Sequence, residues 1–168
     1  CGGYQMLGRE VSDPDHVEGG GTLRGLGLLP QRTVFLGEKT RTQVTGTFTA
    51  SQGIFSAMKG ISFTGYEIHM GETTLDPDAS PILALEDQNG VRKVDGLAAG
   101  NIMGGYIHGI FDKGECAAAL VNCLLRAKGL TAETAAVDWA DYAQQQYDKL
   151  ADGLRAALDM DRIYRILN

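Results

Sequence analysis

Long hydrophobic runs are absent from this sequence. No stretch approaches the roughly 20 consecutive apolar residues that a membrane-spanning helix needs. The first residues contain neither the charged nor the apolar region of a secretory signal. We therefore expect a soluble protein of the cytoplasm that does not bind a membrane.

Cysteine is scarce, and positive charge does not dominate. The chain has three cysteines, an odd number, and no C-x-x-C pair. This usage predicts neither a disulfide framework nor a zinc site, and we expect no cofactor or metal in this chain. Cys116 and Cys123 lie on one helical face and are predicted to be buried. Fifteen Lys and Arg against 21 Asp and Glu, without a basic stripe, argue against nucleic acid as a partner.

The hydrophobic pattern divides the chain into a strand-rich part and a helical part. Segment 9–25 is rich in Asp, Gly and Pro and is predicted to be a loop. Apolar and polar residues then alternate in short segments typical of a largely antiparallel sheet: 31–36, 42–48, 61–71, 81–87, 91–96 and 100–109. Asn89-Gly90 predicts a type I′ hairpin.

Apolar residues recur at helical spacing in the last third of the chain. Residues 114–129 are predicted to form one helix, which ends at Gly129. Residues 137–168 are predicted to form one or two amphipathic helices, with a candidate break at Gly153. Trp139 and its aromatic neighbours are predicted to belong to the core.

The chain opens on Cys1-Gly2-Gly3 followed by a helical run, which is typical of a nucleophile elbow between a strand and a helix. The glycines fit because a side chain there would collide with the backbone or with a substrate. A helix N-terminus favours the thiolate of Cys1, the attacking species in acyl transfer, and the Gly2 N–H would face the oxyanion. Because no strand precedes Cys1, we expect the upstream part of the domain to be missing from this sequence.

A cysteine nucleophile needs a base, and the chain has three histidines: His16, His69 and His108. We predict that His108 is the base, because the segment GGYIHG places it at a strand end with no bulk beside it. Glu67 and His69 share a strand face in GYEIHMG. They form either a hydrogen-bonded pair at the rim of the site or a plain structural network, and the sequence leaves both interpretations open.

Five ordered motifs resemble the glutaminase domain of cobyric acid synthases, the glutamine-dependent amidotransferases of cobalamin biosynthesis: CGGYQMLG, DPDHVEGG, GLGLLPQRTVF, GYEIHMG and GNIMGGYIHGIFD. The resemblance implies an α/β, class I glutamine amidotransferase-like (flavodoxin-like) fold. Its mostly parallel sheet has added antiparallel strands and C-terminal helices, and its N-terminal strands are missing from this chain. Residues 1–168 would be a partial glutaminase domain, without the upstream part and without an ATP-dependent synthetase domain.

The resemblance also implies roles for individual residues. Cys1 would form a glutamyl thioester, His108 would act as acid and base, and Gln5 would lie near the substrate glutamine. The ammonia would pass to the N-terminal synthetase domain of the same protein, where ATP and Mg²⁺ serve the amidation of peripheral carboxylates of a corrinoid, adenosylcobyrinic acid a,c-diamide. Most class I glutaminases have Pro-Glu after the histidine, whereas Gly109 and Ile110 follow here. The site therefore resembles a Cys-His dyad, with Glu67 or a backbone carbonyl holding the imidazole.

Other functions are compatible with the same residues. The chain could be the glutaminase of a related enzyme, cobyrinic acid a,c-diamide synthase or a cell-wall amidating complex. It could be an N-terminal-nucleophile hydrolase, in which the α-amine of Cys1 is the base. A non-catalytic pseudo-glutaminase that only binds a partner is the third alternative. The motifs around Cys1 and His108 favour the glutaminase.

Overall fold

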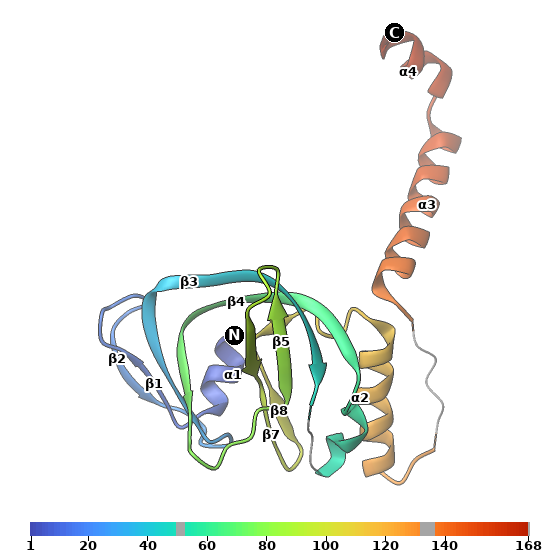
Figure 1. Cartoon of the computed structure of the whole chain (residues 1–168). Helices are drawn as coiled ribbons and strands as arrows, with labels where there is room; N and C mark the ends of the chain where they lie inside the picture. Colours follow the sequence, from blue (N-terminus) through green and yellow to red (C-terminus); the bar gives the residue numbers. More distant parts are fainter. Residues whose placement is uncertain (50–52, 132–136, 168) are drawn as a thin grey trace.

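The fold is built around two long neighbouring strands, β3 and β4, which arch over the first helix (Figure 1). A computed structural model describes residues 1–49, 53–131 and 137–167. Its strands are β1 Glu10–Asp13, β2 Gly21–Arg24, β3 Gln31–Phe48, β4 Ser62–Leu75, β5 Leu83–Asp87, β6 Arg92–Asp95, β7 Leu97–Ala99, β8 Ile102–Gly104 and β9 Ile107–His108. Its helices are α1 Gly2–Leu7, the 3₁₀ helix η1 Gly53–Met58, α2 Gly114–Ala127, α3 Trp139–Ala157 and α4 Met160–Leu167. None of the described helices is long and apolar enough to cross a membrane.

Seven of the described strands form one sheet, in which β3 is central. The order β2-β1-β3-β4-β9 runs across the sheet, and β5 and β6 extend it from β3. Strand β4 pairs with both halves of β3, while β1 pairs with residues 32–34 and β5 with residues 44–48. Strands β7 and β8 form a separate pair.

The mixed α/β class, with antiparallel strands and C-terminal helices, is confirmed. The mostly parallel sheet that the resemblance implies is represented by a single pair, β1 with β3, and the other pairings between described strands are antiparallel. Short connections such as the turn between β5 and β6 can join only antiparallel neighbours. The described residues therefore supply the antiparallel part of such a sheet and little of its parallel part.

The prediction of a loop over residues 9–25 is wrong, because β1 and β2 pair there from Glu10↔Arg24 to Asp13↔Gly21. The Asp13 carboxylate accepts hydrogen bonds from the N–H groups of residues 17–20 at 2.8–3.0 Å. These bonds fold the Asp-, Gly- and Pro-rich residues into the tip of a hairpin. Polar composition identified the tip but not the two flanking strands.

Two further predictions about the sheet need correction. Residues 31–48 form one strand rather than two, with a register shift between Val34 and Lys39 that lets it bend. The hairpin at Asn89-Gly90 is confirmed, but its type is not I′. Such a turn needs a positive φ at both residues. Gly90 has a φ of 77°, whereas Asn89 is not among the residues with positive φ and donates its N–H to the Asp87 carboxylate.

The described part of the body has two apolar clusters. The larger joins β3, β4 and β5 to η1 and α2, and Phe48 and Phe63 meet edge to face in it at 5.4 Å between ring centroids. Cys116 and Cys123 are buried in the same cluster, as predicted. The smaller cluster packs Tyr4 of α1 with Leu29, Leu97 and Tyr106.

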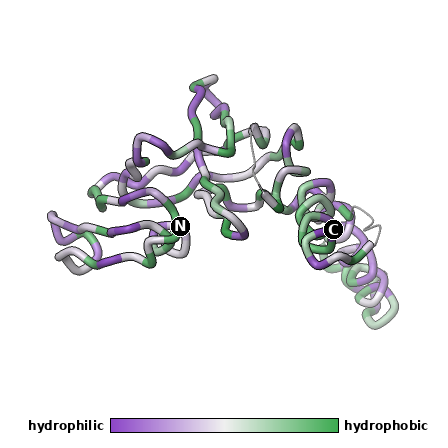
Figure 2. The backbone as a smooth tube through the Cα atoms, turned by 90° about the horizontal axis from the view of Figure 1, so that it is seen from below, coloured by the Kyte–Doolittle hydropathy of each residue, from purple (hydrophilic) through white to green (hydrophobic). Residues whose placement is uncertain are grey.

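The C-terminal helices extend away from this body (Figure 1). Hydrophobic and hydrophilic segments alternate along them (Figure 2), but α3 and α4 have no buried residue among those described. The prediction that Trp139 belongs to the core is therefore wrong, since its exposed fraction is 58%. Gly153 does not break α3, which ends only at Ala157. A single glycine costs a helix about 1 kcal/mol and does not by itself end it.

Candidate active site

Cys1 and His108 meet at the N-terminal end of α1, although 107 positions separate them in the sequence. The Cys1 Sγ lies 3.3 Å from the His108 Nε2. The backbone carbonyl oxygen of Ile68 lies 3.2 Å from the Sγ and 3.3 Å from the same Nε2. The three atoms form a triangle in which a proton on sulfur or on nitrogen always has an acceptor. Both side chains are exposed, so a substrate can reach them.

The free edge of β4 explains why the two residues meet there. Strand β9 pairs with β4 only at Tyr66 and Glu67, so the backbone of β4 beyond Glu67 is not covered by β9. Carbonyls of alternate residues in an antiparallel strand point to the same side. Accordingly, the Ile68 carbonyl reaches Cys1 and His108, and the Met70 carbonyl accepts a hydrogen bond of 3.0 Å from the Gln5 Nε2 of α1.

Two contacts of Tyr4 hold α1 against the rest of the body. The fully buried Gln31 of β3 donates its Nε2 to the Tyr4 carbonyl at 2.8 Å. The Tyr4 ring meets the Tyr106 ring edge to face, with 5.0 Å between centroids. Because Tyr106 lies two residues before His108, this contact also connects the cysteine helix to the histidine strand.

Glu67 and His69, for which the sequence left a rim pair and a structural network open, are hydrogen-bonded to each other. The His69 Nε2 lies 3.1 Å from the Glu67 Oε1, and Lys93 donates to the other carboxylate oxygen. Burial raises the pKa of Glu67, but the hydrogen bonds and charges of His69 and Lys93 outweigh it, so the pKa lies below its usual value. Glu67 is therefore ionised, and its carboxylate is hydrogen-bonded to His69 and Lys93. Of the two groups expected to hold the His108 imidazole, the backbone carbonyl, that of Ile68, is the one in contact.

Tyr106 and Asp95 belong to the same network, and sequence reasoning missed both. The His69 and Tyr106 rings stack with 3.8 Å between centroids and an angle of 20°. Asp95 accepts the N–H of Tyr106 at 2.7 Å, and burial raises the pKa of its carboxyl. The only sequence signal was the position of Tyr106 in GGYIHG, on the strand face of His108.

The other predicted residues lie around the same helix. Gly2 is the first residue of α1, where a backbone N–H has no partner within the helix. A Cβ added at Gly2 or Gly3 would meet no atom within 4 Å, so collision with the backbone does not explain these glycines. Gln5 is buried, with its amide engaged by Met70. His16 lies on the exposed hairpin tip and takes no part in the site.

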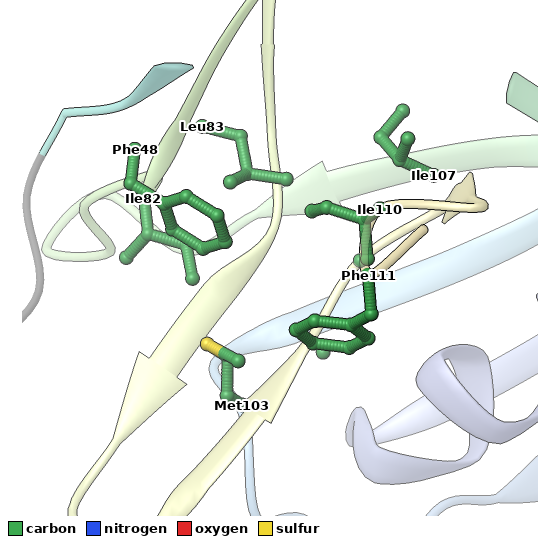
Figure 3. A pocket seen from close by; sticks show the side chains of 9 residues that line it. Phe48, Ile82, Leu83, Met103, Ile107, Ile110 and Phe111 are labelled. Carbon is green, nitrogen blue, oxygen red and sulfur yellow. The ribbon is translucent and has the colours of Figure 1, made fainter. Parts of the chain in front are cut away.

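Two cavities flank the histidine strand. A cleft of about 540 Å³ lies on the side of Glu67 and His69, and Tyr4, Lys93, Asp95 and Tyr106 are among its lining residues. A smaller cavity of about 170 Å³ is bounded by apolar side chains next to His108 in the chain, including Ile107, Ile110 and Phe111 (Figure 3). Polar groups for a small hydrophilic ligand are therefore concentrated on the side of Glu67 and His69.

This arrangement suits nucleophilic chemistry by a thiol. The His108 imidazole can take the Cys1 proton, and the Ile68 carbonyl can then accept the Nε2–H of the imidazolium. No group of three or more His, Cys, Asp or Glu side chains is placed to hold a metal ion within residues 1–49, 53–131 and 137–167. The chemistry that these residues can perform is acyl transfer through sulfur.

Comparison with known proteins identifies the family of this chain. Residues 1–116 match the CobB/CobQ-like glutamine amidotransferase domain. Cobyric acid synthase of Ruminiclostridium cellulolyticum is 44% identical over 171 residues, which cover 99% of this chain and 33% of the relative. Cobyric acid synthase of Citrobacter koseri is 45% identical over 172 residues, which cover 99% of this chain and 33% of that relative. Cobyric acid synthase of Lachnoclostridium phytofermentans is 40% identical over 177 residues, which cover 99% of this chain and 34% of that relative.

The chain spans about a third of the length of the curated relatives it matches. The matched segment contains Cys1, Gln5, Glu67, His69 and His108. The chain belongs to the CobB/CobQ-like glutamine amidotransferase family.

Proposed function

We propose that this chain is a glutaminase that hydrolyses glutamine through a thioester on Cys1 and releases ammonia. The observation that carries the proposal is the 3.3 Å contact between the Cys1 Sγ and the His108 Nε2, in a chain of the glutamine amidotransferase family. A Cys–His pair within hydrogen-bond reach is the arrangement that activates a thiol for attack on a carbonyl.

The reaction proceeds in two halves. His108 takes the Cys1 proton, and the thiolate attacks the carboxamide carbon of glutamine to give a tetrahedral intermediate. The imidazolium returns the proton to the nitrogen, the C–N bond breaks, and ammonia leaves a glutamyl thioester. His108 then takes a proton from water, and the hydroxide attacks the thioester carbon. The C–S bond breaks to release glutamate, and the imidazolium returns its proton to the Cys1 thiolate.

Three backbone and side-chain groups would assist these steps. The Gly2 N–H at the start of α1 would donate to the oxyanion of each intermediate, a contribution of about 3 kcal/mol for a well-placed donor. The Ile68 carbonyl would stabilise the imidazolium whenever the proton resides on His108. Gln5 would support the substrate side by fixing α1 to β4 through its bond to Met70.

For the whole protein we propose the role that its relatives' name suggests, cobyric acid synthase. The ammonia would be used for amidation of peripheral carboxylates of adenosylcobyrinic acid a,c-diamide, with ATP and Mg²⁺ bound by a synthetase domain outside this chain. Three curated relatives with this name, at 40–45% identity, support that choice over a related amidotransferase.

The experiment is covalent labelling of the native protein with 6-diazo-5-oxo-norleucine, an electrophilic glutamine analogue, followed by peptide mass spectrometry. We expect one adduct, on Cys1, formed about 10²–10⁴-fold more slowly in His108→Ala because general acid–base catalysis typically contributes that factor. Cys116 and Cys123 serve as internal controls, because both thiols are buried and should stay unmodified.

The matched histidine control is His16→Asn. His16 is exposed and has a φ of 57°, a conformation that Asn tolerates. We expect this variant to label at the wild-type rate. An unmodified Cys1 would contradict the proposal and favour a binding role. Labelling that is unchanged in His108→Ala but needs a free α-amine on Cys1 would instead favour the N-terminal-nucleophile mechanism.

A further inference from the structure

The His69 ring lies between two oxygen atoms that can only accept hydrogen bonds. Its Nε2 is 3.1 Å from the Oε1 of Glu67, and its Nδ1 is 3.1 Å from the carbonyl oxygen of Gly71. Glu67 accepts a hydrogen bond from the Lys93 ammonium on its other carboxylate oxygen, which favours its ionised form. A neutral imidazole has only one N–H, so one of its nitrogens would place a lone pair against an oxygen lone pair. Only the imidazolium, with two N–H groups, satisfies both contacts.

Burial by itself favours the neutral form of a histidine, whereas an aromatic face and nearby carboxylates favour the cation. The His69 side chain is only 9% exposed, and the face of the Tyr106 ring covers it at a stacking distance. Ionisable groups from four elements and one loop line the same cleft: Tyr4 of α1, Glu38 of β3, Glu67 and Glu72 of β4, Lys93 and Asp95 of β6, and Tyr106 before β9. The carboxylates among these groups outnumber the single lysine. Their combined negative charge therefore opposes the effect of burial on the His69 ring.

The two anchors of the ring lie on either side of the carbonyls that the active site uses. Glu67 and Gly71 are four residues apart on β4, and the Ile68 and Met70 carbonyls lie between them. The ring therefore fixes the stretch of β4 whose edge contacts Cys1, His108 and Gln5. Through Tyr106, it also contacts the segment that leads into His108.

We propose that His69, held as an imidazolium between Glu67 and Gly71, is a positioning residue for the reaction. It acts by presenting the Ile68 and Met70 carbonyls to the thiol, the imidazole of His108 and the amide of Gln5. This role rests on the proposed glutaminase function for its catalytic consequence. Its structural part, the doubly protonated ring, does not depend on that function.

The first test observes the ring directly. In native protein labelled with ¹⁵N-histidine, long-range ¹H–¹⁵N spectra distinguish an imidazolium from either neutral tautomer by its two ring nitrogen shifts. We expect imidazolium shifts at pH 7.5 for the signals that disappear in His69→Gln. Shifts of a neutral tautomer at that pH would overturn the proposal, and this measurement needs no folded variant beyond the one used for assignment.

The second test measures what the ring does for Cys1. In His69→Gln, 6-diazo-5-oxo-norleucine labelling should slow by about 10- to 100-fold, since a displacement of about 1 Å from the reacting geometry can cost about 100-fold. The pH midpoint for Cys1 alkylation by iodoacetamide should rise, because the thiolate loses part of its contact with His108. His69→Phe keeps a ring against Tyr106 but makes neither hydrogen bond. Its labelling rate should therefore fall at least as much as that of His69→Gln.

The control is again His16→Asn, and circular dichroism checks that each variant is folded. A folded His69→Gln with the wild-type labelling rate and alkylation midpoint would overturn the positioning role, as would a fully active His69→Phe. Failure of the glutamine analogue to label wild-type Cys1 would overturn the glutaminase function instead. The iodoacetamide midpoint and the ring nitrogen shifts would still decide the role of His69.

Discussion

Asp13 is the residue whose charge contributes most visibly to local structure. Its carboxylate accepts four backbone N–H groups of the hairpin tip. Burial raises the pKa of Asp13, but these bonds outweigh it and hold the pKa at about 2. The unfolded value is about 3.9. The stabilisation is therefore fully present above about pH 4 and is lost as the pH falls through about 2.

We predict that Asp13→Asn lowers the midpoint of thermal unfolding at pH 7, because an amide offers one acceptor atom and turns its NH₂ toward N–H donors. The difference from wild type should shrink between pH 4 and pH 2, as wild-type Asp13 loses its charge. Asp15→Asn, at an exposed carboxyl in the same loop, is the control and should leave the midpoint unchanged. A difference that stays constant down to pH 2 would refute the role of the charge.

Single residues also mark what the sequence could predict about the site. Cys1 and His108 were recognisable because glycines flank both, and the Glu67–His69 pair followed from strand alternation. The Ile68 carbonyl was not recognisable, since every residue has a carbonyl and only the end of β9 determines which one is uncovered. Lys93 and Asp95 reach the site through the β5–β6 hairpin, whose position depends on packing across β3.

At the scale of elements, the close approach of β9 to β4 places His108. Gly65 permits it, because a Cβ there would lie 2.4 Å from the His108 carbonyl oxygen and 2.6 Å from the Ile107 Cγ2. The first of these atoms is backbone and cannot move without moving β9. An added methyl group would therefore separate the histidine strand from the strand that carries the Ile68 carbonyl.

We predict that Gly65→Ala reduces Cys1 labelling by 6-diazo-5-oxo-norleucine about 10- to 100-fold and costs about 1–3 kcal/mol of unfolding free energy. The control is Gly37→Ala in β3, where an added Cβ meets no atom within 4 Å and φ is not positive. It should change stability by less than about 0.5 kcal/mol. Equal labelling by the two variants would show that the approach of β9 does not set the position of His108.

Elements with strong periodicity were predictable and those made by tertiary pairing were not. Helix α2 was expected over residues 114–129 and spans Gly114–Ala127, because its apolar stripe faces the larger cluster. Strands β1 and β2 are four residues each, too short for alternation to be read from the sequence. They form because Asp13 closes the tip and because β1 finds a parallel partner in β3.

At the scale of the whole molecule, the chain consists of a packed body and a helical arm. The body buries Phe63 and its neighbours in the larger cluster, where Phe63 is 1% exposed. On α3 the apolar stripe has the same periodicity as a core helix, yet Leu150 is 61% exposed and Leu154 is 49% exposed. Periodicity predicted the helix correctly but could not say whether its stripe is covered, because that depends on contacts outside the helix.

This division predicts unequal costs for truncating apolar side chains in the chain 1–168. Phe63→Ala should cost about 3–5 kcal/mol of unfolding free energy, since it removes buried area and leaves a cavity beside Phe48. Leu150→Ala should change it by less than about 0.5 kcal/mol, because the side chain is already in water and Ala is a good helix former. Urea unfolding followed by circular dichroism measures both. A cost above about 1 kcal/mol for Leu150→Ala would mean that the arm packs against an apolar surface in solution, which would make its stripe part of a core after all.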